Sequence, residues 1–195
     1  MDDKDKNQVY EPEEEKDNKT VLAEDWSPAH NFKIVRILLN DIIIALVLSV
    51  LLFKIIFNVS IVSGTSMNPT LHDGNLLLLN HLFYEPEYND IVVFENEERG
   101  LLVKRIIGMP GDTIEIHNSV VYRNGVPLEE DYIHNGYFGP GDMTGPVTVE
   151  DGHIFVMGDN RPDSYDSRYN GVGQVSEDLI LGGAILRVYP FSLLK

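Results

Sequence analysis

Hydrophobic residues follow two patterns along this chain, one long unbroken run and then a series of short runs. The long run covers about residues 37–57, and its centre at 42–53 carries no polar stripe. Roughly 20 helical residues cross a bilayer core of about 30 Å. The pattern therefore predicts one transmembrane helix, which we place at residues 33–58. A buried or amphipathic soluble helix is the alternative, and the missing stripe argues against it.

The polar residues in and around this run predict whether the helix is cleaved off and how it is oriented in the membrane. Asn40, Asp41 and Lys54 lie near its ends, where their side chains can reach the headgroup region. The preceding segment is long and acidic and no small-residue cleavage pattern follows, so we expect an uncleaved anchor. Lys33 and Arg36 flank its amino end, which favours a cytoplasmic amino terminus and an extracytoplasmic carboxyl-terminal domain.

Beyond residue 58 the apolar runs shorten to the length of strands and alternate with turn residues. Asn124 and Gly125 form a two-residue hairpin signal, residues 96–100 suit a second hairpin, and 109–112 suit a type II turn. Residues 131–146 indicate a long loop. We therefore predict one mainly β domain at 59–195, built from antiparallel strands. The expected strands cover residues 76–79, 91–94, 101–107, 147–149, 154–157 and 180–188.

Charge and composition exclude several classes of function. Residues 1–32 hold ten Asp or Glu against four Lys, which is typical of a disordered tail, here on the cytoplasmic side. The formal net charge of -16 argues against a nucleic-acid partner, which needs a basic face. The chain has no cysteine and its six histidines show no metal-binding spacing, so we expect neither a metal nor a cofactor.

One serine and one lysine stand out as candidate chemistry. Ser66 lies in a short segment between glycine and proline, but a serine hydroxyl attacks only when a base removes its proton. Lys104 lies in an apolar strand, with Leu102 and Ile106 on the same face, and burial favours its neutral form. The neighbouring Arg105 cannot lose its proton. The sequence thus offers a Ser/Lys pair. A Ser/His/Asp triad is the alternative, but no histidine lies in a nucleophile-elbow context.

Three segments resemble a known family. GTSMNPTL at residues 64–71, KRIIGMPGD at 104–112 and GDNRPDSYDSR at 158–168 are similar to the motif boxes of type I signal peptidases, the peptidase S26 family. The resemblance covers about residues 35–190 in the expected order. It implies a membrane-anchored serine endopeptidase that removes signal peptides from exported preproteins after small residues at positions -3 and -1. It also implies that the lipid bilayer is a partner of the enzyme, which we expect to work as a monomer.

The resemblance assigns roles to individual residues. It makes Ser66 the nucleophile and Lys104 the general base, with the Ser164 hydroxyl holding the lysine amine. Asp166 and Arg168 match a buried supporting ion pair, whose loss would leave an uncompensated charge. The rest of that motif consists of Asp159, Asn160, Arg161 and Ser167.

The same resemblance implies how substrate is bound. Met67 packs beneath the nucleophile and helps to shape the pocket for the residue before the cut. We expect the substrate to add as an extended strand beside Val62 and Val103. Some family members have a serine at the position of Gly64, so the oxyanion site must combine the Ser66 amide with another donor, such as Ser63 or water.

Three other interpretations stay open. The segment at 158–168 could be a calcium loop because of its three aspartates, although it lacks the alternate carboxylates, central glycine and final glutamate of an EF-hand. A soluble self-cleaving regulator resembling the LexA repressors would share the Ser/Lys chemistry, but the apolar helix and the absence of a DNA-binding segment oppose it. The third is a catalytically idle, membrane-anchored assembly factor.

Overall fold

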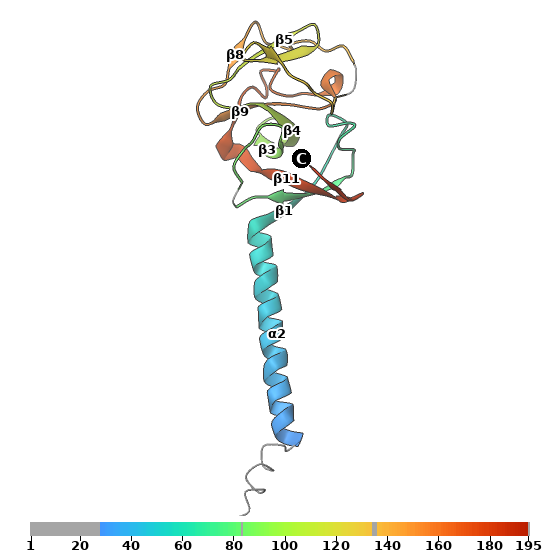
Figure 1. The fold of residues 1–195 in the computed structure, drawn as a ribbon, viewed down its shortest axis with the longest axis vertical. Coiled ribbons are helices and arrows are strands. Elements are labelled where there is room, and N and C mark those ends of the chain that lie inside the picture. Colours follow the sequence, from blue (N-terminus) through green and yellow to red (C-terminus); the bar gives the residue numbers. More distant parts are fainter. Residues whose placement is uncertain (1–27, 83, 134–135, 195) are drawn as a thin grey trace, which may run out of the picture. The chain divides into compact units, whose positions relative to one another are not determined.

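The computed structural model describes residues 28–82, 84–133 and 136–194. The chain divides into two units, residues 1–50 and 51–195, which are described separately. Most of the segment predicted as a disordered tail lies outside the described residues. The described chain begins with a long helix and continues into a set of strands (Figure 1).

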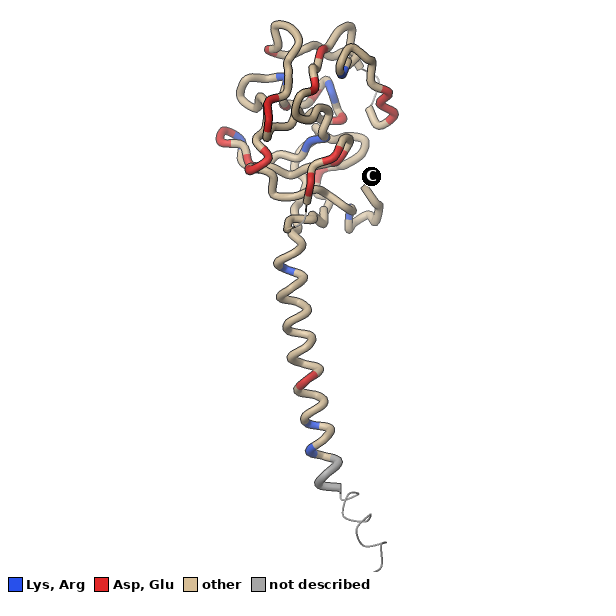
Figure 2. Tube along the Cα trace, turned by 60° about the vertical axis from the view of Figure 1, so that its left-hand side comes forward, with Lys and Arg blue, Asp and Glu red and all other residues tan. Residues whose placement is uncertain are grey.

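The helix α2 spans Pro28–Ile56 and contains the apolar run. Its stretch Phe32–Ile56 has a mean hydropathy of 2.4 and is the one helix among the described residues that is long and apolar enough to cross a membrane. Its charged positions lie outside the central apolar stretch, as Figure 2 shows. The helix begins at Pro28, a residue that suits a first helical turn because its missing N–H needs no partner. It ends before residue 57, because Phe57 already pairs with a strand.

The larger sheet is antiparallel in every pairing, which confirms the predicted fold class (Figure 1). Its strands follow the order β1-β2-β11-β3-β4-β9-β10, with β12 paired to β11. The bounds are β1 (Phe57–Ile61), β2 (Leu76–Asn80), β3 (Ile91–Asn96), β4 (Gly100–Gly108), β9 (His153–Met157), β10 (Val175–Ser176), β11 (Ile180–Tyr189) and β12 (Ser192–Leu193).

A smaller sheet has the order β7-β6-β5-β8. It consists of β5 (Thr113–His117), β6 (Val120–Arg123), β7 (Val126–Pro127) and β8 (Val147–Thr148). Ile114 and Ile116 of β5 point into the core, as their alternation with polar residues predicts. Asn124 and Gly125 both have positive φ angles, +55° and +77°, which the tight turn between β6 and β7 requires. The remaining helical elements of the described chain are the 3-10 turns η2 (Arg161–Asp163) and η3 (Glu177–Leu179).

The strand β4 matters most for the site, and its turns fix its position. The hairpin from β3 pairs Val92 with Lys104 and Ile91 with Arg105. After β4, the amide of Asp112 donates to the carbonyl of Met109 at 3.0 Å, and Gly111 has a φ of +86°. This geometry confirms the predicted turn at 109–112. Lys104 is therefore held on a strand that is anchored at both ends.

Three apolar clusters form the core of the β unit. One of them joins Val62 and Met67 to strand β2, and Val103 packs against it. A second joins Ile106 to Val92 and includes the partly buried Leu102. The third lies beneath the smaller sheet. All three clusters draw on β4, through Val103, Ile106 and Ile107, so this strand separates regions of the core. Lys104 lies between Val103 of one cluster and Ile106 of another.

Candidate active site

Ser66 and Lys104 lie side by side. The Nζ of Lys104 is 2.9 Å from the Oγ of Ser66 and 2.9 Å from the carbonyl oxygen of Val103. Lys104 is only 3% exposed, whereas Ser66 is partly accessible. Ser66 comes from the loop between β1 and β2, and Lys104 comes from β4. The structure thus places an accessible hydroxyl within hydrogen-bonding distance of a buried amine.

The environment of Lys104 favours its neutral form. Burial lowers the pKa of Lys104 from 10.5 to about 8, against the opposing effect of the Asp166 and Asp159 carboxylates. Apolar surroundings disfavour the charged ammonium more strongly than these two carboxylates favour it. The amine can therefore accept a proton at a pH where an exposed lysine could not.

Backbone contacts from the 158–168 segment hold the Ser66 loop. The amide of Asn160 donates to the carbonyl of Ser66 at 2.9 Å, and its side-chain amide donates to the carbonyl of Thr65 at 3.1 Å. The Thr65 hydroxyl in turn donates to Asp163 at 2.6 Å. These contacts join two segments that are far apart in the sequence, and they fix the direction of the Ser66 side chain.

Gly158 lies where the two segments approach most closely. A Cβ atom at this position would lie 2.2 Å from the Oγ of Ser164 and 2.4 Å from the carbonyl oxygen of Ser66. Any side chain here would therefore displace backbone atoms of the site. The close approach, rather than an unusual φ angle, requires glycine at this position.

Ser164 lies within the same site, and its hydroxyl has a partner. Its Oγ donates to Asp166 Oδ2 at 2.7 Å, and the same carboxylate oxygen accepts the Gly158 amide at 3.0 Å. The hydrogen bonds of the Lys104 amine go to Ser66 and Val103. The predicted hydrogen bond between Ser164 and the lysine amine is thus replaced here by one to Asp166, and the role of Ser164 toward Lys104 stays a prediction.

Asp166 and Arg168 form a two-bond ion pair in the interior. The guanidinium contacts both carboxylate oxygens, at 2.8 and 2.9 Å, and both side chains are at most 1% exposed. Arg168 also donates to the carbonyls of Arg161 and Ser164, at 2.7 and 3.2 Å. The pair therefore ties together both ends of the turn that contains Ser164.

The other residues of this motif are also buried in polar contacts. Asp159 binds Arg105 through both carboxylate oxygens, at 2.9 and 2.6 Å, and accepts the hydroxyl of Thr70 at 2.5 Å. The Ser167 hydroxyl accepts the amide of Val156 at 2.9 Å. The aspartates that suggested a calcium loop bind arginine or threonine side chains instead, which is the arrangement of a structural network.

The residues expected to bind substrate lie around one apolar cluster. Val62 is 3% exposed and Met67 is 1% exposed, and the partly buried Val103 packs against the cluster that contains them. Ser63 and Gly64 are exposed next to Ser66. The amide of Gly64 donates to Asp73 at 2.8 Å, so it is already engaged. Of the predicted oxyanion donors, the Ser66 amide and Ser63 remain candidates.

Several contacting residues could not be found from the sequence. Thr70, Asp73, Glu130 and Tyr132 all bind residues of the site or of its loops. Thr70 lies within a recognised motif, so its position was a weak signal. The others lie in loops and are brought to the site only by the fold.

Comparisons of sequence relate this chain to known proteins. A sequence model of the family described as signal peptidase, peptidase S26, matches residues 35–189. Signal peptidase I from Bacillus licheniformis is 39% identical over 166 residues, covering 79% of this chain and 88% of the relative. Signal peptidase I T from Bacillus subtilis is 39% identical, with 79% and 85% covered.

Matches of this extent define an enzyme, a serine-type endopeptidase. The chain belongs to the signal peptidase family, peptidase S26. A solved structure of a signal peptidase I from Enterococcus faecalis is 36% identical, covers 51% of this chain and 96% of that chain, and has a TM-score of 0.44.

Proposed function

We propose that this protein removes N-terminal signal peptides from exported preproteins, with Ser66 as nucleophile and Lys104 as general base. The observation that carries the proposal is the 2.9 Å contact between the buried Lys104 amine and the Ser66 hydroxyl. A neutral amine at this distance is suited to remove the hydroxyl proton. Membership of the family supports the same reaction.

The reaction would proceed through an acyl-enzyme. Ser66 Oγ attacks the scissile carbonyl carbon while Lys104 Nζ takes its proton. The amide of Ser66 and a second donor, Ser63 or a water molecule, stabilise the oxyanion. The intermediate collapses when Lys104 returns the proton to the leaving amine. A water molecule, deprotonated by Lys104, then attacks the ester carbonyl. The bond to Ser66 Oγ breaks, Lys104 returns the proton to that oxygen, and the signal peptide leaves with a new carboxyl group.

The apolar cluster around Met67 would select the substrate. The preprotein would lie as an extended strand beside Val62 and Val103, where backbone hydrogen bonds set its register. Since Met67 and Val62 are almost fully buried, little space remains beneath the nucleophile. Small side chains, typically alanine, would therefore fit at positions -1 and -3.

The buried polar residues would keep this geometry rigid. The Asp166–Arg168 pair would hold Ser164 near Lys104. Asp159 would hold Arg105, the residue that follows Lys104 on β4. Asn160, Arg161 and Ser167 would fix the backbone around them. Rigid support of this kind matters because a shift of about 1 Å can cost roughly 100-fold in rate.

The protein would work at the outer face of a membrane as a single-pass monomer. Residues 33–58 would anchor it, the acidic segment 1–32 would be cytoplasmic, and residues 59–195 would form the extracytoplasmic catalytic domain. The long apolar helix supports an anchor. Lys33 and Arg36 at its amino end support this orientation.

Cleavage of a preprotein by full-length enzyme in liposomes tests the dyad. We expect Ser66→Ala and Lys104→Ala to be inactive yet folded, because each removes one member of the proposed pair. Lys104→Arg should also be inactive yet folded, because arginine remains charged. Ser176→Ala, a serine of β10 that lies outside all three motifs, is the matched control and should keep activity. A preprotein with phenylalanine at position -1 should resist cleavage. Full activity of Lys104→Arg would rule out lysine as the base.

Protease accessibility in intact cells tests the orientation. Protease added outside should digest the domain at 59–195 and spare the segment at 1–32. An antibody tag at each end distinguishes the two fragments, and lysed cells provide the control in which both segments are cut. Protection of the carboxyl-terminal domain in intact cells would reverse the proposed topology.

A further inference from the structure

We infer that Glu130 and Tyr132 are positioning residues for the Ser66–Lys104 site, an inference that rests on the proposed function of that pair. Both residues lie in the loop between β7 and β8, outside every motif that the sequence revealed. Together we call them the loop clamp. One contacts the segment that holds the nucleophile loop, and the other contacts the strand that carries the base.

Glu130 acts on the segment around Gly158. Its carboxylate oxygens accept two hydrogen bonds from the Arg161 guanidinium, at 2.8 and 2.5 Å. Arg161 is fully buried, and its Nε donates to the carbonyl of Gly158 at 3.0 Å. Gly158 is the residue whose close approach to Ser66 leaves no space for a side chain. Glu130 therefore orients a guanidinium that fixes the backbone directly behind the nucleophile.

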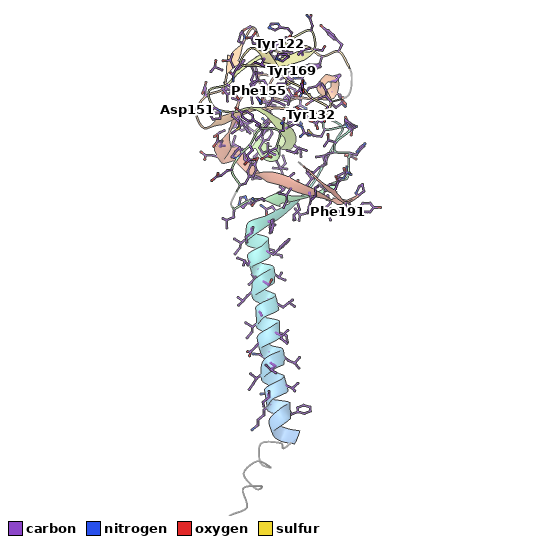
Figure 3. All side chains as sticks on the ribbon, in the orientation of Figure 1. Tyr122, Tyr132, Asp151, Phe155, Tyr169 and Phe191 are labelled. Carbon is purple, nitrogen blue, oxygen red and sulfur yellow. The ribbon has the colours of Figure 1, made fainter. Side chains whose placement is uncertain are left out.

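Tyr132 acts on the strand β4. Its ring lies under the guanidinium of Arg105, with 4.0 Å between the Arg105 Cζ and the ring centroid. Tyr132 is labelled in Figure 3, at the level of the strand that carries Arg105. Arg105 follows Lys104 and binds Asp159 through two hydrogen bonds. The ring thus closes off one side of the ion pair that lies next to the base.

The two members of the clamp are joined to each other. The Tyr132 hydroxyl donates to Glu130 Oε1 at 2.7 Å. Burial, together with the Glu130 carboxylate, raises the pKa of Tyr132, so the phenol stays a donor. Burial opposes the charge on Arg161, but Glu130, together with Tyr132 and Asp166, outweighs burial and raises the pKa of Arg161. One carboxylate therefore holds both halves of the support, through Arg161 and through Tyr132.

This arrangement predicts an effect on the chemical step rather than on substrate binding. Neither residue belongs to the apolar cluster of Val62 and Met67, which would receive the substrate side chain. Loosening the clamp would shift Gly158 and Arg105, and through them Ser66 and Lys104. The expected signature is a lower kcat with an almost unchanged KM.

The test compares three variants of the full-length protein in liposomes with a preprotein substrate. Glu130→Gln keeps the shape and removes the charge, and we expect kcat to fall about tenfold or more. Tyr132→Phe keeps the ring beneath Arg105 and should lower kcat about threefold. Tyr132→Leu removes the ring as well and should lower kcat further. KM should stay within about twofold in all three.

Matched controls come from the same part of the chain. Glu129→Gln removes a charge from the neighbouring exposed residue, and Tyr137→Phe removes a hydroxyl from a side chain that is 85% exposed. Both should behave as wild type. Val121→Ala, in the fully buried core of the smaller sheet, should lower the melting temperature without lowering kcat.

The outcomes separate the clamp from general stability and from the proposed function. Wild-type kcat in Glu130→Gln and Tyr132→Leu overturns the clamp, as does an equal loss of kcat in Val121→Ala at a matched drop in melting temperature. If Glu130→Gln does not fold, the two Tyr132 variants decide the matter alone. Retained cleavage by Ser66→Ala contradicts the proposed nucleophile instead, whatever the clamp variants do.

Discussion

The amide of Asn160 donates a hydrogen bond to the carbonyl of Ser66, and the two atoms lie 2.9 Å apart. This contact joins the third motif to the first at the proposed nucleophile itself. The second motif reaches the same serine through Lys104. All three segments that carry the family resemblance therefore meet within hydrogen-bonding distance of one residue, and the following predictions test what each contributes.

The first prediction concerns the dependence of activity on pH. Lys104 must be neutral to act as a base, and burial lowers its pKa to about 8. We expect kcat/KM for preprotein cleavage to rise with pH up to an apparent pKa near 8 and to fall about tenfold per pH unit below it. An apparent pKa near 10.4 for the acidic limb of this profile, the value of an exposed lysine, would show that burial does not lower the pKa of Lys104.

The second prediction concerns how much the burial of Lys104, the proposed base, costs in stability. The folded pKa of Lys104 lies below that of an unfolded lysine, so the unfolded state binds more protons between about pH 8 and 10.4. The penalty is thus full below pH 8 and disappears as pH rises to 10.4. Lys104→Met should raise the free energy of unfolding at pH 7 by up to about 3 kcal/mol.

Denaturant unfolding of the full-length protein in detergent at pH 7 and pH 10 measures this difference. The stabilisation should shrink at pH 10, while cleavage should be lost at both values. Lower stability of Lys104→Met at pH 7 would show that the lysine contributes more through its contacts than it costs through burial.

The third prediction concerns Gly158. Adding one methyl group should push the Ser66 carbonyl and the Ser164 hydroxyl away, since both lie within 2.4 Å of the new atom. Gly158→Ala should lower kcat by about 100-fold in the preprotein assay. Gly145→Ala is the control, because nothing lies within 4 Å of its Cβ position, and it should keep full activity. Comparable activity of the two variants would refute the close approach.

The fourth prediction compares a buried ion pair with an exposed hydrogen-bonded contact. Asp166→Asn leaves the Arg168 guanidinium without its carboxylate in the interior and should cost about 3 to 5 kcal/mol of unfolding free energy. Glu115→Gln breaks the contact with His117, whose side chain is 62% exposed, and should cost less than about 1 kcal/mol. Chemical denaturation of both variants provides the measurement, and similar costs would argue against a structural role for Asp166.

The parts of the fold that depend on local sequence were predicted correctly. Length and apolarity were enough to find the helix, and Gly111 and Gly125 marked turns whose positive φ angles the structure has. The boundary at Phe57 was missed, because this residue continues the apolar run although it pairs with β2. Apolarity alone does not separate the last turn of a helix from the first residues of a strand.

The parts of the site that depend on tertiary contacts were harder to predict. The resemblance brought Ser66 and Lys104 together and predicted a hydrogen bond between Ser164 and the lysine amine, whereas the Ser164 hydroxyl in the structure donates to Asp166. Glu130 has no periodicity or motif around it, and it binds Arg161, which lies 31 positions away in the sequence.

The exposure of single aromatic residues was also not predictable from residue type. Phe191 is 73% exposed on the loop between β11 and β12 (Figure 3), although aromatic residues are often buried.

The hairpin between β3 and β4 decides which cationic side chain faces Ser66, the proposed nucleophile. Lys104 and Arg105 are neighbours on one strand, so they point in opposite directions, and only one of them can release a proton. A slip of one residue in the pairing would exchange them and present a permanently charged group to Ser66. Asn96 accepts the amides of Glu98 and Arg99 at 3.2 and 3.1 Å, which fixes the count of residues in this turn. Inserting one residue in this turn should shift the pairing of β3 with β4 by one position. The enzyme should then be inactive, although Ser66 and Lys104 would both still be present.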